Sequence, residues 1–124
     1  MGIVLASEDR EPGAYPADFN LGPGYNGVLV AIDYTAEGGA TATLDAKLQY
    51  FEPGEGDYND IPGAVFTQLT GVSESHVVFA PGITAAAGPP ITAVSVALPD
   101  RIRLLCTVGT DNLTFTASVT RLKS

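Results

Sequence analysis

The chain has 124 residues, and its 14 Asp and Glu against 6 Lys and Arg give a formal net charge of −8. Nucleic-acid binding draws on clustered cations, so this balance excludes nucleic acid as the expected partner and also disfavours an anionic membrane surface. The length suits one domain, and 14 Gly with 9 Pro spread between apolar runs favour many short strands over helices.

The first 26 residues combine a short apolar segment with a long Pro/Gly-rich one. Residues 2–6 predict a short strand, whereas residues 7–26 show no hydrophobic periodicity and predict an extended arm. A structureless run of this length is unusual inside a compact domain. The arm therefore either packs over the domain through Tyr15, Phe19 and Leu21, or it reaches onto a neighbouring subunit.

From residue 27 onward the chain reads as a series of strands separated by Gly- or Pro-containing turns. Residues 27–35 are apolar on both faces, as in a central strand that is covered on both sides. Residues 41–51 alternate between apolar and polar side chains, the period of a strand with one buried face. Further short strands are predicted at residues 65–68, 75–80 and 91–98.

The last two predicted strands, residues 101–108 and 113–121, show the clearest alternation and are joined by a Gly-Thr-Asp-Asn turn. The second of them has an apolar row and a hydroxyl-rich row, which we expect to be buried and wet respectively. The wet row is either a docking surface or plain exterior, and consists of Thr114, Thr116, Ser118 and Thr120. About eight strands at this spacing predict an all-β, single-domain antiparallel β-sandwich, jelly-roll-like, over residues 27–124, preceded by the N-terminal strand and extended arm over residues 1–26.

Residue types that often carry chemistry are few and poorly placed for it. Cys106 lies in a predicted buried row, so we expect a small core hydrophobe and no disulfide. His76 has Ser and Glu beside it only in sequence, whereas a catalytic set must converge from separated segments. The G-x-G-x-x-G match at residues 22–27 precedes a strand, not the helix that dinucleotide binding needs. We therefore expect no enzyme activity and no cofactor.

An acidic loop over residues 52–60 is the one segment that suggests a ligand. Calcium takes oxygen ligands from such loops, but the spacing of an EF-hand is absent, so we expect no resident metal. An aromatic side chain beside hydrogen-bond acceptors also suits a pyranose, while a solvated hairpin tip has the same composition. The candidate ligand residues are Glu52, Glu55, Asp57, Tyr58 and Asp60.

Residues 44–50, 57–71 and 98–109 resemble a group of small β-sandwich virion proteins of tailed bacteriophages. In those proteins an aromatic residue often precedes an Asp-Ile/Leu-Pro-Gly-Ala turn, as Tyr58 precedes the Asp-Ile-Pro-Gly-Ala sequence of residues 60–64 here. The resemblance covers the larger, C-terminal part of the chain and leaves the predicted arm unmatched.

The resemblance implies a virion structural protein, and we expect a capsid decoration (cement) protein that binds and stabilises the head shell. It would be made in the host cytoplasm, and its partners would be the major capsid protein and copies of itself, with a trimer as the implied stoichiometry. The alternatives are a tail, neck or baseplate component and, from another class, a carbohydrate-binding module. The predicted interface residues are Tyr15, Phe19, Leu21, Tyr25, Thr114, Thr116 and Thr120.

Overall fold

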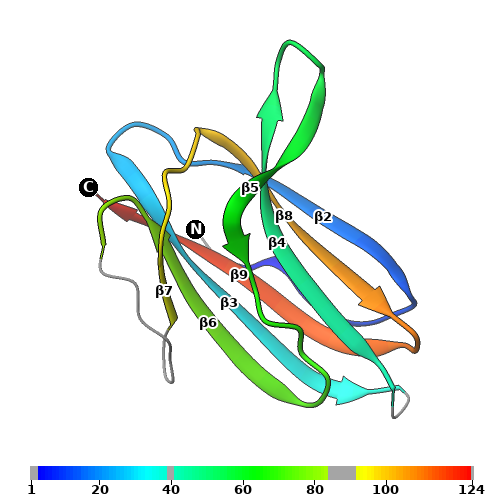
Figure 1. The fold of residues 1–124 in the computed structure, drawn as a ribbon. Helices are drawn as coiled ribbons and strands as arrows, with labels where there is room; N and C mark the ends of the chain where they lie inside the picture. The colour runs from blue at the N-terminus through cyan, green and yellow to red at the C-terminus, as the bar shows by residue number, and fades with distance from the viewer. Residues whose placement is uncertain (1–2, 39–40, 84–91, 124) are drawn as a thin grey trace.

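Figure 1 shows a computed structural model that describes residues 3–38, 41–83 and 92–123. Regular structure in these ranges is entirely β, and none of it is a helix that could cross a membrane. The strands are β1 (Ile3–Arg10), β2 (Gly13–Asn20), β3 (Tyr25–Glu37), β4 (Thr43–Glu52), β5 (Asp57–Val65), β6 (Ser73–Ala80), β7 (Thr92–Ser95), β8 (Arg101–Gly109) and β9 (Leu113–Lys123).

The strands form two sheets that enclose a shared core. Sheet A has the order β1-β9-β3-β6-β7 and sheet B the order β2-β8-β4-β5. Neighbouring strands are antiparallel except for β6 and β7, which run parallel. When β7 is set aside, each sheet has four strands and the chain passes repeatedly from one sheet to the other, the arrangement of a jelly roll. The predicted all-β sandwich is confirmed.

The alternation along each strand explains the core. Every second residue of β8, and of β9 as far as Val119, is buried, and the rows from the two sheets meet between them. Phe66, which follows β5, and Phe79 of β6 make an edge contact between the sheets, with ring centroids 5.6 Å apart. Burying one large apolar side chain contributes roughly 1.5–3 kcal/mol, so these rows dominate stability. Cys106 is a fully buried member of this core, as predicted.

The N-terminal segment is not the extended arm that its Pro/Gly content suggested. Residues 13–20 form β2, which pairs with β8 along its whole length, and β1 extends to Arg10. Strand β2 lies at the edge of sheet B, where one side of the strand has no partner, and proline is tolerated in such strands, as at Pro16. Phe19 and Leu21 are 6 % and 2 % exposed, so they belong to the core of this chain and are not available to a neighbouring subunit.

Three other boundaries differ from the prediction. The acidic segment is a hairpin, because β4 continues to Glu52 and β5 begins at Asp57. The positive φ of 71° at Gly56 closes this turn, a conformation that glycine adopts without steric cost. The strand predicted at residues 65–68 is the end of β5 and the extended segment after it. The strand predicted at 91–98 is shorter, and residue 91 lies outside the described residues, as does residue 2 of the predicted N-terminal strand.

Candidate functional site

Side chains that point away from the core make two outer surfaces, one on each sheet. Face A is the outer surface of sheet A and face B is that of sheet B, both defined from the alternation along the strands and the cross-strand register. The residues of face A are Leu29, Ala31, Asp33, Glu74, His76, Val78, Thr114, Thr116, Ser118 and Thr120. The residues of face B are Ala14, Pro16, Asp18, Asn20, Asp45, Lys47, Gln49, Phe51, Tyr58, Asp60, Val65, Arg101, Arg103, Leu105 and Thr107.

A connected polar row crosses three strands of face B. Gln49 on β4 stands opposite Arg103 of β8 on one side and opposite Asp60 of β5 on the other. Arg103 Nε donates to Gln49 Oε1 at 2.7 Å, and Gln49 Nε2 donates to Asp60 Oδ1 at 2.7 Å. Lys47 Nζ lies 3.0 Å from the same carboxylate. The neighbouring side chains leave Gln49 only 7 % exposed on the outside of the sheet.

The electrostatics of this row keep its carboxylate charged. Hydrogen bonds from Gln49 and then from Lys47 hold the pKa of Asp60 below its usual value, and the positive charge of Lys47 acts in the same direction. Asp60 is therefore ionised at neutral pH and accepts from both neighbours. The groups of this row satisfy one another, so the row ties β5, β4 and β8 together on the outside of the sheet.

Beside the polar row, two arginines cover two aromatic rings. Phe51 and Tyr58 are cross-strand partners whose ring centroids lie 5.4 Å apart in an edge-on arrangement. The guanidinium carbon of Arg101 lies 3.8 Å from the Phe51 centroid, and that of Arg103 lies 4.3 Å from the Tyr58 centroid. Each such contact contributes about 0.5–1 kcal/mol at an exposed site. A pyranose that stacked on these ring faces would have to displace a guanidinium group.

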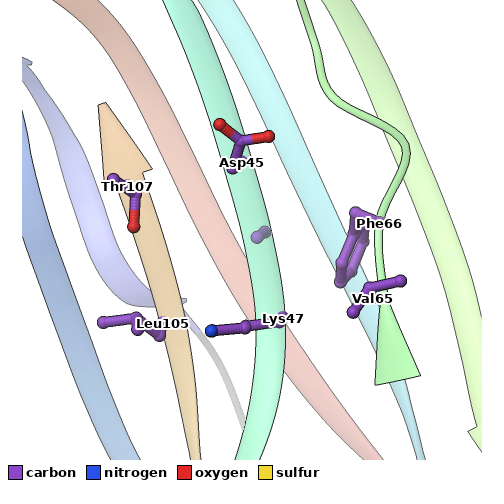
Figure 2. Close-up of a pocket in the computed structure, with 7 residues that line it drawn as sticks. Asp45, Lys47, Val65, Phe66, Leu105 and Thr107 are labelled. Carbon is purple, nitrogen blue, oxygen red and sulfur yellow. The ribbon is translucent and has the colours of Figure 1, made fainter. Parts of the chain in front are cut away.

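A half-open pocket of about 340 Å³ lies on face B next to the polar row (Figure 2). In Figure 2 the Lys47 side chain extends from β4 toward Leu105, its cross-strand neighbour on β8. Val65, at the pocket, is an apolar side chain that is 56 % exposed. The pocket thus combines carbon surface with a few polar groups, and its lining residues are Asp45, Ala46, Lys47, Val65, Phe66, Leu105 and Thr107.

The carboxylates of the predicted ligand loop are occupied by the hairpin itself. Three of them accept a hydrogen bond from a nearby N–H group at 2.8 or 2.9 Å, and the fourth, Asp60, belongs to the polar row. The three pairs are Gly54 N to Glu52, Tyr58 N to Asp57 and Asn59 Nδ2 to Glu55. In the described part of the chain no cluster of three or more His, Cys, Asp and Glu could hold a metal ion. These contacts explain the acidic loop as a stabilised turn.

The predicted interface residues do not form one surface. Thr114 and Thr116 are half-buried and Thr120 is exposed, all on face A, where β9 lies between β1 and β3. Tyr15 and Tyr25 are half-buried against the core, and each ring has an arginine over it: Arg10 at 5.6 Å and Arg121 at 4.5 Å, measured from the guanidinium carbon to the centroid. Phe19 and Leu21, corrected above, lie inside the sandwich.

Face A also carries the single histidine. His76 Nε2 lies 3.7 Å from Glu74 Oε2, and the register places His76 opposite Ala31 of β3. Around it the face carries short hydroxyl and apolar side chains, with Thr120 opposite Leu29 and Ser118 opposite Ala31. Asp33 and Glu74, which stand opposite each other, add two carboxylates. This is a mixed surface suited to contact with another macromolecule.

Sequence reasoning missed the residues that dominate face B. Arg101, Arg103 and Gln49 stand in the outward rows of strands whose alternation was recognised, so the signal for their exposure was present. What the sequence could not show is that β8 and β4 are neighbours, because these rows are more than fifty residues apart along the chain.

Comparison with known proteins gives distant structural likenesses. No family model and no curated protein matches the chain. It is similar to a solved xylan-binding domain from CBM 22, formally an x6b domain, with 18 % identity over 96 % of this chain and 79 % of that chain and a TM-score of 0.48. It is also similar to CorA, a surface-associated copper-binding protein of Methylomicrobium album BG8, with 11 % identity over 90 % and 78 % of the two chains and a TM-score of 0.24. Neither likeness informs the function.

Proposed function

We propose that this chain is a non-enzymatic structural protein of a tailed-bacteriophage virion, a capsid decoration protein that binds and stabilises the head shell. The observation that supports the proposal is the position of the three resembling segments. Residues 44–50 lie in β4, residues 57–71 contain β5, and residues 98–109 contain β8. These strands are adjacent in sheet B, so the likeness concerns one continuous part of a fold and not scattered residues.

A decoration protein works by binding and needs no chemical step. A protein that binds the assembled shell and not the free shell subunits stabilises the shell by mass action, by about 2.7 kcal/mol per site at a concentration of 100 Kd. A rigid sandwich with two outer faces suits this role, because little order has to be gained when either face is covered.

Face A is the surface we assign to the shell. Strand β9, between β1 and β3, presents Thr114, Thr116 and Thr120, whose hydroxyls both donate and accept hydrogen bonds. Apolar Leu29 and Val78 lie on the same face. Non-obligate interfaces mix polar and apolar area in this way and carry about one hydrogen bond per 100–200 Å².

The experiment that tests the function is a copy-number measurement on purified particles of the phage that encodes the chain, by quantitative mass spectrometry. A head decoration protein is expected in copies on the order of hundreds, because it follows the symmetry of the shell. About six or twelve copies would instead indicate a neck or baseplate component. Absence of the chain from washed particles would overturn the virion assignment.

A carbohydrate-binding module is the second candidate, favoured by the pocket on face B. At about 340 Å³ the pocket is in the size range of small-ligand sites, with Asp45, Lys47 and Thr107 as polar groups beside carbon surface. A glycan array with and without Ca²⁺ tests it, with a Lys47→Ala variant to locate any binding. An array that stays negative at millimolar protein would decide against this candidate.

A further inference from the structure

Face B has no net charge, whereas the rest of the molecule is strongly acidic. Face B holds three cations and three carboxylates, so it is neutral, and the whole net charge of −8 lies on the rest of the chain. The six groups are Lys47, Arg101, Arg103, Asp18, Asp45 and Asp60. Two copies of so acidic a protein repel each other through their other surfaces, whereas face B presents no net repulsion to a copy of itself.

Two charged groups of face B have no hydrogen bond or ion pair in the described part of the chain. The Arg101 guanidinium packs on Phe51 but donates to no acceptor there, whereas each of the other three arginines donates at least one hydrogen bond. Asp18 on β2 has neither a hydrogen bond nor an ion pair among the described residues. The stacked guanidinium is already held in place, so little side-chain freedom is lost when it binds a carboxylate.

The register places these two groups close together. Asn20 stands opposite Arg101 across β2 and β8, and Asp18 is two residues from Asn20 along β2. Diagonal neighbours of this kind are about 7–8 Å apart. A two-fold axis that passes between them would set Arg101 of one copy against Asp18 of the other and would generate the same ion pair a second time.

The size and carbon content of face B also suit a second copy. Four strands about 4.8 Å apart, each about eight residues long at 3.4 Å per residue, span roughly 19 Å by 27 Å, or about 500 Å² before side-chain relief. Because side chains make the surface uneven, its accessible area exceeds this flat area and approaches the ~800 Å² per partner of a standard interface. Face-to-face contact would also cover the exposed Val65 and the neighbouring pocket, removing apolar surface from water.

We propose that face B is a self-association surface, which pairs with face B of a second copy of this chain about a two-fold axis. The two Arg101–Asp18 ion pairs fix the register of the dimer, and the carbon surface around Leu105 and Val65 supplies burial. Face A stays exposed on both outer sides of the dimer. This inference goes beyond the proposed function and does not depend on binding to a head shell.

Sedimentation equilibrium of the full chain at low salt tests the proposal with a charge swap. The wild type is expected to have twice the 12.8 kDa protomer mass. Arg101→Asp alone and Asp18→Arg alone should each weaken association at least tenfold, because each sets like charges against each other twice. An equimolar mixture of the two variants should dimerise again, since each interface then holds one Asp–Arg and one Arg–Asp pair.

The controls separate association from folding. Lys123→Asp makes the same change in net charge as Arg101→Asp, away from face B, and should leave the dimer intact. Circular dichroism should show the same β spectrum for all variants. The proposal is overturned by a wild type that is monomeric at millimolar concentration or trimeric, by single variants that still dimerise, or by a mixture that stays monomeric. A monomer that binds a glycan through Lys47 would assign face B to a sugar instead.

Discussion

On the outside of sheet B, the Gln49 side-chain amide donates to Asp60 at 2.7 Å while its carbonyl accepts from Arg103. Gln49 therefore joins β5 to β8 through β4, and it is nearly inaccessible to water although it points away from the core. Because Arg103 also packs on Tyr58, the row couples the hydrogen bonds of face B to its aromatic rings.

Replacement of this amide should destabilise the fold. Gln49→Ala leaves Arg103 and Asp60 without their shared partner, and we expect a loss of about 1–3 kcal/mol in the free energy of unfolding. Urea unfolding followed by tyrosine fluorescence measures it. Gln68→Ala removes an exposed amide that donates to Asp45 and should cost less than about 0.5 kcal/mol. Equal costs for the two variants would contradict the role assigned to Gln49.

Stability should depend on the ionisation of Asp60. Its pKa is lower in the folded state than the usual 3.8, so its charged form stabilises the fold above 3.8, and this contribution is lost as the pH falls through the folded pKa. Asp60→Asn should therefore be less stable than the wild type at neutral pH and should converge with it in strong acid. Paired urea titrations across this range check the prediction, and a difference that is constant with pH would refute it.

Cys106 should be chemically silent in the native protein. Burial raises the pKa of its thiol to about 12, which the positive charge of Arg10 only partly opposes. Since the thiolate is the reactive form, a thiol reagent at pH 8 should label Cys106 only when the sandwich opens. The labelling rate should rise with urea in parallel with unfolding. Rapid labelling in native buffer would mean that β8 is more open than the structure shows.

The N-terminal strands should be indispensable. Deletion of residues 1–26 removes β1 and β2, takes Phe19 and Leu21 out of the core and leaves β8 and β9 as new unpaired edges. We expect the truncated chain to be unfolded or aggregated by circular dichroism and size exclusion. A folded, monomeric truncation would restore the extended-arm interpretation. The milder variant Phe19→Ala should fold, with a loss of about 3–5 kcal/mol.

The stability of the fold should depend on an arginine at position 10. It is 5 % exposed and donates to the carbonyl oxygens of Ala6 at 2.7 Å and Phe115 at 2.9 Å, with its guanidinium carbon 4.4 Å from the Phe115 centroid. Arg10→Ala should cost about 3 kcal/mol because it leaves carbonyl groups unpaired near the core. Arg10→Lys should recover only part of this, since an ammonium group cannot reproduce the planar fork. Full recovery by lysine would show that charge alone matters.

Much of the sandwich can be predicted from the sequence. The alternation of Leu113, Phe115, Ala117 and Val119 with hydroxyl residues predicts β9 and its buried row. The apolar run at residues 27–32 predicts a strand at the centre of its sheet, as β3 is, but only one face of β3 is buried and its other face is not covered as that run suggested. Strand β2 was not predicted. Its Gly13 and Pro16 are typical of turns, although Tyr15, Ala17 and Phe19 keep the period of two. An edge strand tolerates proline, and only pairing with β8 reveals which edge it occupies.

Local periodicity thus determined that this chain is a β-sandwich and which rows its strands bury, because side-chain alternation is a property of each strand alone. Only the tertiary structure decided which outward side chains lie next to one another on the surface. Gln49 meets Arg103 and Asp60, and Arg101 lies near Asp18, only because β2, β8, β4 and β5 are neighbours in that order. Cross-strand hydrogen bonds set this order between segments far apart in the chain. The side-chain period of a single strand does not indicate which strands lie beside it.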